Sequence, residues 1–489
     1  MDTPQDAQFD LVSQRLGALP LVNHFLDRMD LSGLLARWLP APDRRFRLDP
    51  AVAIRLVVVN LLIGRAPLYG LGEWAAPFAP TLLGLGEADT AWLNDDRVGR
   101  ALEKLFHADR ASLLTELIVG VVSEFGVATS ELHNDSTSVS VHGAYRGADG
   151  TPRGGKPTPV ITFGHSKDHR PDLKQLVWIL TISADGAVPM AYRLADGNTS
   201  DDPTHVPTWD HLVALLGRRD FLYIADSKLA SGVAMRHIDG NGGRFITVLP
   251  RTRGEDKWFR DWAQTNQPQW TEAIRLPGAR IGDPDKVYST FPAPLPSAEG
   301  YRIIWVHSST KATRDAAARQ ARVEAGAAAI DALAAKLTGP KSRLRTRTAV
   351  DEAAAAALAD AGAARWIAVT ITETVEETYH QERRGRPGTN TRYRKNNKTR
   401  YTISWQPRTD VIAYDAATDG CFPLITNDTA LPDDGILGAY RYQPPGSGGA
   451  LLHRRPLRTV HATRRGTRPK QAAWAIQIVG CNTVFPAAA

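Results

Sequence analysis

The chain has 489 residues, too many for one simple core, and its 43% hydrophobic and 8% aromatic content is that of a folded globular protein. Its only cysteines, Cys421 and Cys481, exclude a disulfide framework or a cysteine-based zinc cluster and fit a reducing cytoplasm. The N-terminus lacks a signal-peptide pattern, and the most apolar run, 54–64, is interrupted by Arg55 and Asn60, so we expect no membrane association.

The net charge of +7 is concentrated in two segments. From Gly435 onward there are eight Lys and Arg residues and no acid, and the rest of the chain has 51 basic against 52 acidic residues. Residues Arg383–Arg400 hold another eight basic residues and no acid. Such runs either contact nucleic acid or lie in solvated loops, and both interpretations stay open for Arg383–Arg400.

In chain order, residues 8 to about 126 favour a small helical domain, because apolar residues recur there at helical spacing. The character changes near Leu132. An alternating strand pattern begins there, followed by a Gly- and Pro-rich loop, two strands joined at Asp185-Gly186, and a helix, strand, helix and strand. The first strand is 135–141, the loop is 143–159 and the next two strands are 176–183 and 187–194. The first helix is 205–216, and the last two strands are 220–226 and 244–249, with the second helix between them. This order predicts an α/β fold with an RNase H-like mixed sheet.

Residues 251–420 interrupt that core and predict an α+β insertion domain. The strand candidates are 301–306, 366–371 and 401–405, and Ala-rich stretches at 312–337 and 350–361 favour a helical hairpin. Residues 421–426 are one more strand candidate. The predicted domains are therefore a helical N-terminal domain 1–126, a core 127–250, an insertion 251–420, a return to the core 421–443, and an aberrant tail 444–489.

Two aspartates are the candidate metal ligands. Asp226 ends an apolar strand, where a buried carboxylate is costly unless it binds a cation or hydrogen-bond donors. Asp135 lies in the first strand, which neighbours the fourth in an RNase H-like sheet, so the two carboxylates are expected about 4–7 Å apart. Paired carboxylates bind Mg²⁺ or Mn²⁺, which can promote phosphoryl transfer. The alternative for either residue is a structural turn or helix cap.

Four stretches of the sequence have a recognisable pattern: Asp135–Tyr145, Gly164–Gln175, Asp196–Asp201 and Tyr223–Lys228. Together they resemble bacterial insertion-sequence transposases of the DDE type, in the branch with a Tyr-Arg-Glu-Lys signature. The resemblance spans roughly residues 10–443. It implies that Asp135 and Asp226 are catalytic and hold Mg²⁺ or Mn²⁺. It also implies DNA partners (transposon ends and target DNA), a homodimer in the DNA complex, and a role in end binding for residues 1–126.

Basic residues near these motifs are candidate phosphate contacts, because the site must hold a polyanion. They are Lys167, Arg170, Lys174 and Arg441, and ordinary surface charge is the alternative. Residues Gly150–Lys156 match the spacing of a phosphate-binding P-loop, but Pro157 replaces the Ser or Thr that would hold Mg²⁺, which favours a plain loop.

The third acid of the signature has no evident counterpart. Tyr440-Arg441 resembles the start of the signature, but Pro-Pro-Gly-Ser-Gly-Gly follows Gln443, and a helix does not form through such a run. No Asp or Glu occurs after Asp434. Either the reading frame shifts near codon 444, or the tail is divergent and Asp428 or Asp434 takes the role. A non-enzymatic DNA-binding remnant and a host RNase H-like nuclease therefore remain as alternatives to an active transposase.

Overall fold

The chain divides into two compact units in the computed structural model, which describes residues 13–41, 47–86, 92–166, 170–278, 280–339, 342 and 344–442. The first unit extends to Thr247 and includes the chain again from Ala439. The second unit is Val248–Gly438.

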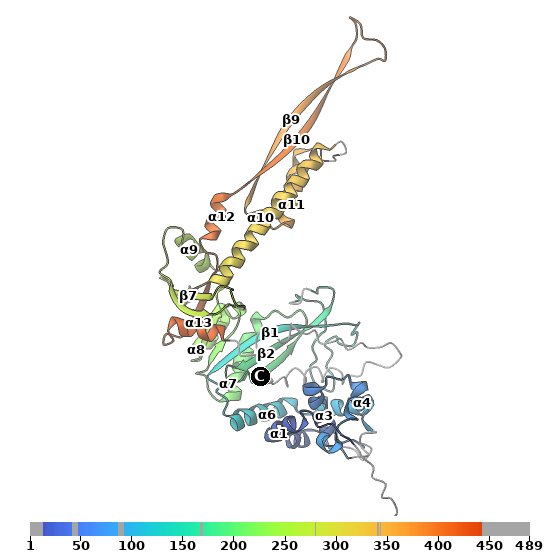
Figure 1. Ribbon diagram of the computed structural model, residues 1–489, viewed down its shortest axis with the longest axis vertical. Coiled ribbons are helices and arrows are strands. Elements are labelled where there is room, and N and C mark those ends of the chain that lie inside the picture. The colour runs from blue at the N-terminus through green and yellow to red at the C-terminus, as the bar shows by residue number, and fades with distance from the viewer. Residues whose placement is uncertain are drawn as a thin grey trace, which may run out of the picture. The chain divides into compact units, whose positions relative to one another are not determined.

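The first unit begins with helices, as predicted (Figure 1). Asp30, with a left-handed φ of 48°, separates the first two helices. Asp109 caps the last helix by accepting the Ser112 N–H. The elements are α1 (Leu19–Arg28), α2 (Leu31–Trp38), α3 (Pro50–Ile63), η1 (Leu68–Gly70), α4 (Leu71–Ala75), η2 (Pro80–Leu83), α5 (Asp95–His107) and α6 (Arg110–Phe125).

Helix α3 is apolar on all sides because it lies inside the helical core, as such a helix must. Its one buried polar side chain, Asn60, is satisfied by both backbone groups of Ala66. No single helix among the described residues is long and apolar enough to cross a membrane; α3 passes such a test only together with Leu68–Ala75, at a bend of 100°.

The sheet of the first unit has the strand order β3-β2-β1-β4-β5. Strands β1, β2 and β3 are antiparallel neighbours, whereas β4 pairs in parallel with both β1 and β5. The predicted RNase H-like order is therefore confirmed. The elements are β1 (Glu131–Val141), β2 (Lys174–Ser183), β3 (Pro189–Ala195), η4 (Asp202–Thr204), α7 (His205–Leu216), β4 (Leu222–Ile224), η5 (Ser227–Leu229), α8 (Gly232–Gly240) and β5 (Arg244–Val248).

The second unit contains an antiparallel set of strands in the order β11-β8-β7-β6. Strands β8 and β11 were predicted, whereas β6 and β7 were not. Helix α9 packs here through Phe259, whose ring stacks on Trp305 at 3.6 Å between centroids. The elements are α9 (Gly254–Trp262), β6 (Thr271–Leu276), β7 (Lys286–Pro292), β8 (Arg302–Ser308) and β11 (Cys421–Thr426).

The predicted helical hairpin of the second unit is formed by α10 and α11, and a two-stranded ribbon of β9 and β10 packs beside it (Figure 1). The sequence predicted only the inner ends of these two strands, which are 15 residues each. The elements are α10 (Ser309–Thr338), α11 (Arg347–Asp360), β9 (Ile367–Gln381), β10 (Tyr393–Pro407) and α12 (Thr409–Ala416), and α13 (Asp433–Arg441) follows β11.

Candidate functional site

Asp135 lies in β1, and Asp226 lies two residues beyond the end of β4, the parallel neighbour of β1. The register of the two strands ends where His133 of β1 pairs with Ile224 of β4. If it continued for two more residues, it would bring Asp135 level with Asp226. Adjacent strands lie about 4.8 Å apart. The separation of the two carboxylates stays a prediction.

Buried and more exposed residues alternate along β1, and this alternation shows which side of the sheet carries Asp135. Asn134 and Ser136 are buried, and Asn134 donates to Thr181 Oγ1 at 2.8 Å on that side. Asp135 lies between them on the other side and is exposed, with its Oδ1 accepting the Ser136 N–H at 2.8 Å. Residues two apart in a strand point to the same side, so His133 and Asp135 share a side.

The environment of Asp226 corrects one sequence-based expectation. Its carboxylate is exposed rather than buried, so the cost of burying a charge does not demand a cation there. Oδ1 accepts the backbone N–H of Lys228 at 3.1 Å, as a cap of η5 does. The Thr247 hydroxyl donates to the Asp226 carbonyl at 2.5 Å and ties it to β5. The residue is thus both a local cap and an accessible carboxylate.

Tyr440, near the end of α13, is close enough to both carboxylates to sense their charge. Burial raises the pKa of its phenol to about 12, and the negative charges of Asp226 and Asp135 add to the shift. Two residues on, the ring of Tyr442 lies 6.3 Å from the ring of His133. Residues 440–442 therefore run along the side of β1 that carries Asp135. The sequence suggested Tyr440 only as part of a motif, because its proximity depends on tertiary structure.

A buried His–Tyr pair lies near Asp226, and no sequence pattern indicated it. His205 Nδ1 is 3.2 Å from the Tyr223 hydroxyl. Burial lowers the pKa of His205, although the nearby charges of Asp226, Asp201 and Asp202 oppose that shift. The histidine is therefore held neutral and acts as a hydrogen-bonding core residue.

The expected metal site consists of two carboxylates, and their binding of a cation stays a prediction. Among the described residues, no three His, Cys, Asp or Glu side chains are grouped so as to hold a metal ion. Asp428 is buried, and its Oδ1 accepts the N–H groups of Ala430 and Leu431, as in a structural turn. Asp434 accepts the Gly435 N–H at 2.9 Å. The run after Gln443 lies outside the described residues.

The predicted phosphate contacts have different surroundings. Arg170 forms a bidentate ion pair with Asp172, and this hydrogen bonding lowers the pKa of Asp172 to about 2. Lys174 donates to the Ala144 carbonyl at 2.8 Å. Arg441 lies next to Tyr440 at the end of α13. Lys167 lies outside the described residues.

The P-loop-like segment is a plain loop, as expected. The Lys156 ammonium donates to the carbonyls of Phe106, His107 and Ala108, at the C-terminus of α5. It therefore caps a helix end, where a positive charge is favourable.

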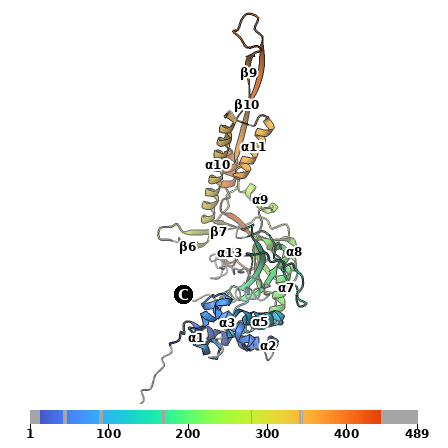
Figure 2. The same cartoon turned by 90° about the vertical axis from the view of Figure 1, so that its right-hand side faces the viewer.

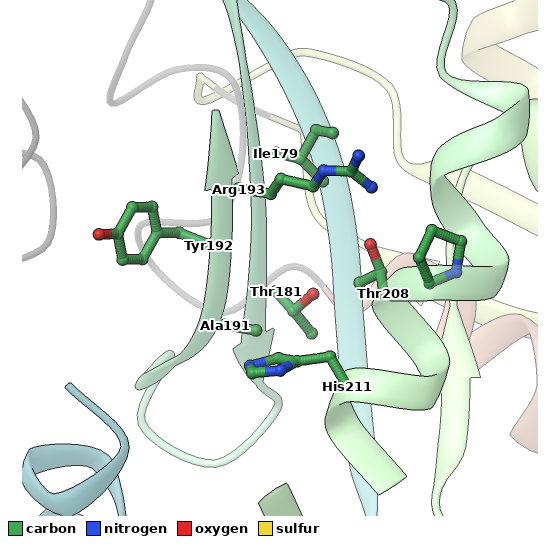
Figure 3. Close-up of a pocket in the computed structure, with 8 residues that line it drawn as sticks. Ile179, Thr181, Ala191, Tyr192, Arg193, Thr208 and His211 are labelled. Atoms are coloured by element: carbon green, nitrogen blue, oxygen red, sulfur yellow. The ribbon is translucent and has the colours of Figure 1, made fainter. Parts of the chain in front are cut away.

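A pocket of about 260 Å³ is lined by residues of β2, β3 and α7 (Figure 3). Strand register places Thr181, which lines the pocket, on the side of Asn134, opposite to Asp135. In Figure 3 Arg193 and His211 point into the space between the strands and α7, whereas Tyr192 points away. The pocket is therefore separate from Asp135.

Comparisons with known proteins give one family match and several structural ones. A domain of unknown function, DUF4277, matches residues 11–119. No curated protein matches the chain. A piggyBac transposase in a synaptic complex with hairpin DNA is similar over 56% of this chain and 57% of that chain, with 8% identity and a TM-score of 0.29.

Two structures of Mos1 transposase are also similar. The paired-end complex with the left transposon end has 10% identity and a TM-score of 0.17, over 44% of this chain and 63% of that one. The mariner paired-end complex with Mn has 11% identity and a TM-score of 0.17, over 48% and 68%. The chain thus spans less than two thirds of the piggyBac chain and of the first Mos1 chain. Similarity of this extent assigns no activity to this protein.

Proposed function

We propose that this protein is a DNA-processing protein of the DDE transposase type, in which Asp135 and Asp226 hold a divalent cation. The observation that carries the proposal is the parallel pairing of β1 with β4, whose last pair, His133 with Ile224, lies two residues before Asp135 and Asp226. The Tyr440 phenol supports their proximity as well, because the charges of both aspartates raise its pKa. Transposon ends and target DNA are the substrates that the sequence resemblance implies.

The residues of the chain fit an oxygen-coordinated cation. Mg²⁺ and Mn²⁺ prefer carboxylate oxygens and share them with phosphate, where they stabilise the charge that develops during phosphoryl transfer. Both carboxylates are exposed, so DNA can approach them. The Lys228 N–H orients the carboxylate of Asp226, and the Thr247 hydroxyl fixes its backbone.

Metal binding tests the proposal without requiring turnover. We expect Asp135→Asn and Asp226→Asn each to weaken Mn²⁺ binding at least about tenfold, because each removes one of two charged ligands. Electron paramagnetic resonance of free and bound Mn²⁺ measures the affinity. Asp360→Asn, at an exposed aspartate in α11, is the matched control. Unchanged Mn²⁺ affinity in both site variants would sink the proposed metal site.

A second candidate function is that of a DNA-binding remnant without catalysis. It is favoured by the lack of any third metal-ligating side chain beside the pair among the described residues, and by the lack of acids after Asp434. A protein that binds Mn²⁺ and DNA yet leaves DNA uncut would fit this candidate. Metal-dependent cutting without end-specific strand transfer would instead indicate a nuclease of the same fold.

A further inference from the structure

The ribbon of β9 and β10 is anchored at one end and free at the other. At its inner end Ile367 and Ile403 are buried against the α10–α11 hairpin, and the Trp405 indole donates to Asp331 at 2.9 Å. Further out, the strands continue beyond the ends of the two helices (Figure 2). The ribbon is thus held firmly enough to present its outer part to a partner.

The outer part has two different faces, because residues opposite each other in the ladder point the same way. One, the tyrosine face, continues the buried apolar face outward and consists of Glu373, Val375, Glu377, Tyr379, Gln381, Tyr393, Lys395, Asn397, Thr399 and Tyr401. The other, the basic face, consists of Thr372, Thr374, Glu376, Thr378, His380, Arg394, Asn396, Lys398, Arg400 and Thr402.

Charge is unevenly divided between these faces. The tyrosine face carries one lysine, Lys395, which is paired with Glu377 at 2.5 Å. The basic face carries three cations, and only Arg400 is paired, with Glu376 at 2.6 Å. Arg394 and Lys398 are exposed and form no ion pair with any residue that the structure describes. Arg383, Arg384, Arg386 and Arg392 of the connecting loop are likewise exposed and without such a pair.

We propose that the basic face and its loop bind the phosphate backbone of duplex DNA, an inference that rests on the proposed function and extends it. A two-stranded ribbon is narrow enough to enter the major groove. Unpaired Arg and Lys side chains neutralise phosphates, and the Thr and Asn side chains between them can donate hydrogen bonds to phosphate oxygens. Because the basic face is positively charged, we expect its partner to be a polyanion and not a second copy of the chain.

The test is DNA binding by the full chain in EDTA, so that it does not depend on the metal site. The probe is a labelled duplex of mixed sequence, about 30 base pairs long, titrated at several salt concentrations. We expect Arg394→Gln with Lys398→Gln to weaken binding at least about tenfold near 0.1 M salt and to lower the salt slope by nearly 2. Arg314→Gln with Arg322→Gln, which removes the same charge from exposed positions of α10, should leave both unchanged.

Two further variants test whether the loop and the basic face, and not the tyrosine face, bind the DNA. Replacing residues 382–392 by Asn-Gly closes the ribbon with a tight turn and removes the loop cations, so it should lower the salt slope as well. Tyr379→Ser with Tyr393→Ser should leave DNA affinity unchanged. Equal losses in the tyrosine-face and basic-face variants would overturn the face assignment. Unchanged affinity in the basic-face variant, or a loss matched by the α10 control, would overturn DNA binding by the ribbon even if Mn²⁺ binding holds.

Discussion

Tyr440 reports on the two carboxylates at the scale of single residues. Its pKa is about 12, raised by burial and then by the charges of Asp226 and Asp135. Removing both charges by Asp135→Asn with Asp226→Asn should lower the pKa toward the value that burial alone sets. Titration of carbon-13-labelled tyrosines by NMR, with Tyr440→Phe for assignment, measures it. An unchanged pKa would show that Tyr440 does not face the pair.

The raised pKa of Tyr440 also has a consequence for stability. The folded state holds the phenolic proton more tightly than the unfolded state, whose tyrosine pKa is near 10. The stabilising contribution is therefore fully present below about pH 10 and is lost as pH rises toward the folded pKa of about 12. Tyr440→Phe should remove this part of the alkaline loss of stability, as measured by urea unfolding at a series of pH values.

Lys156 is expected to stabilise the end of α5. Lys156→Met removes a cation that donates to carbonyls at the helix C-terminus and should cost about 1–2 kcal/mol of unfolding free energy. Urea denaturation measures the loss. Arg100→Gln, on an exposed position of the same helix, is the control and should change stability by less than about 0.5 kcal/mol. If Lys156 served only to bind phosphate, Lys156→Met would leave the unfolding free energy unchanged, which would contradict the prediction.

At this scale the sequence pointed to the two aspartates as metal ligands, because each belongs to a recognisable motif, and that role stays a prediction. The sequence misjudged the exposure of Asp226, since the end of a buried strand can still open to solvent. It could not place Tyr440 near the two aspartates or His205 near Asp226, because both approaches depend on how helices pack in the fold.

Close packing of α10 against the end of α11 gives a prediction at the scale of elements. A Cβ added at Gly326 would lie 2.4 Å from the Cβ of Ala363, so Gly326→Ala should force the hairpin apart and cost about 1–3 kcal/mol. Gly120→Ala in α6 is the control, because nothing lies within 4 Å of its added Cβ. It should instead stabilise the protein by about 0.5–1 kcal/mol. Thermal unfolding of both variants distinguishes these outcomes, and equal effects would contradict the packing.

Elements with a regular apolar pattern were predicted well, whereas strands that are stabilised mainly by their neighbours in the fold were not. The predicted helix 205–216 and strand 421–426 match α7 and β11. Strand β6 was missed because it is exposed along most of its length and lacks apolar alternation. The outer ribbon was missed because its charged and polar residues are stabilised by the ladder itself and by cross-strand pairs such as Arg400 with Glu376.

At the scale of the whole molecule, the strand order followed from the chain order of elements, because short connections limit the topologies available. The division at Thr247 and Gly438 falls inside β5 and α13, so no linker in the sequence marks either limit. The predicted domain limits and the role of residues 1–126 in end binding stay predictions. The tail 444–489 lies outside the described residues.

Catalysis by this chain would depend on how firmly its two carboxylates position a cation. No acid follows Asp434, and the described residues bring no third metal-ligating side chain to the pair. Two carboxylates leave a bound cation loosely positioned, and cation positioning accounts for much of phosphoryl-transfer catalysis. The present sequence should therefore bind DNA but cut it at least about 100-fold more slowly than a version whose reading frame is restored after codon 443. A Mg²⁺-dependent cleavage assay on DNA that flanks the coding sequence compares the two, with Asp226→Asn in the restored version as the inactive control. Equal cutting by both versions would show that another acid, such as Asp428 or Asp434, completes the site.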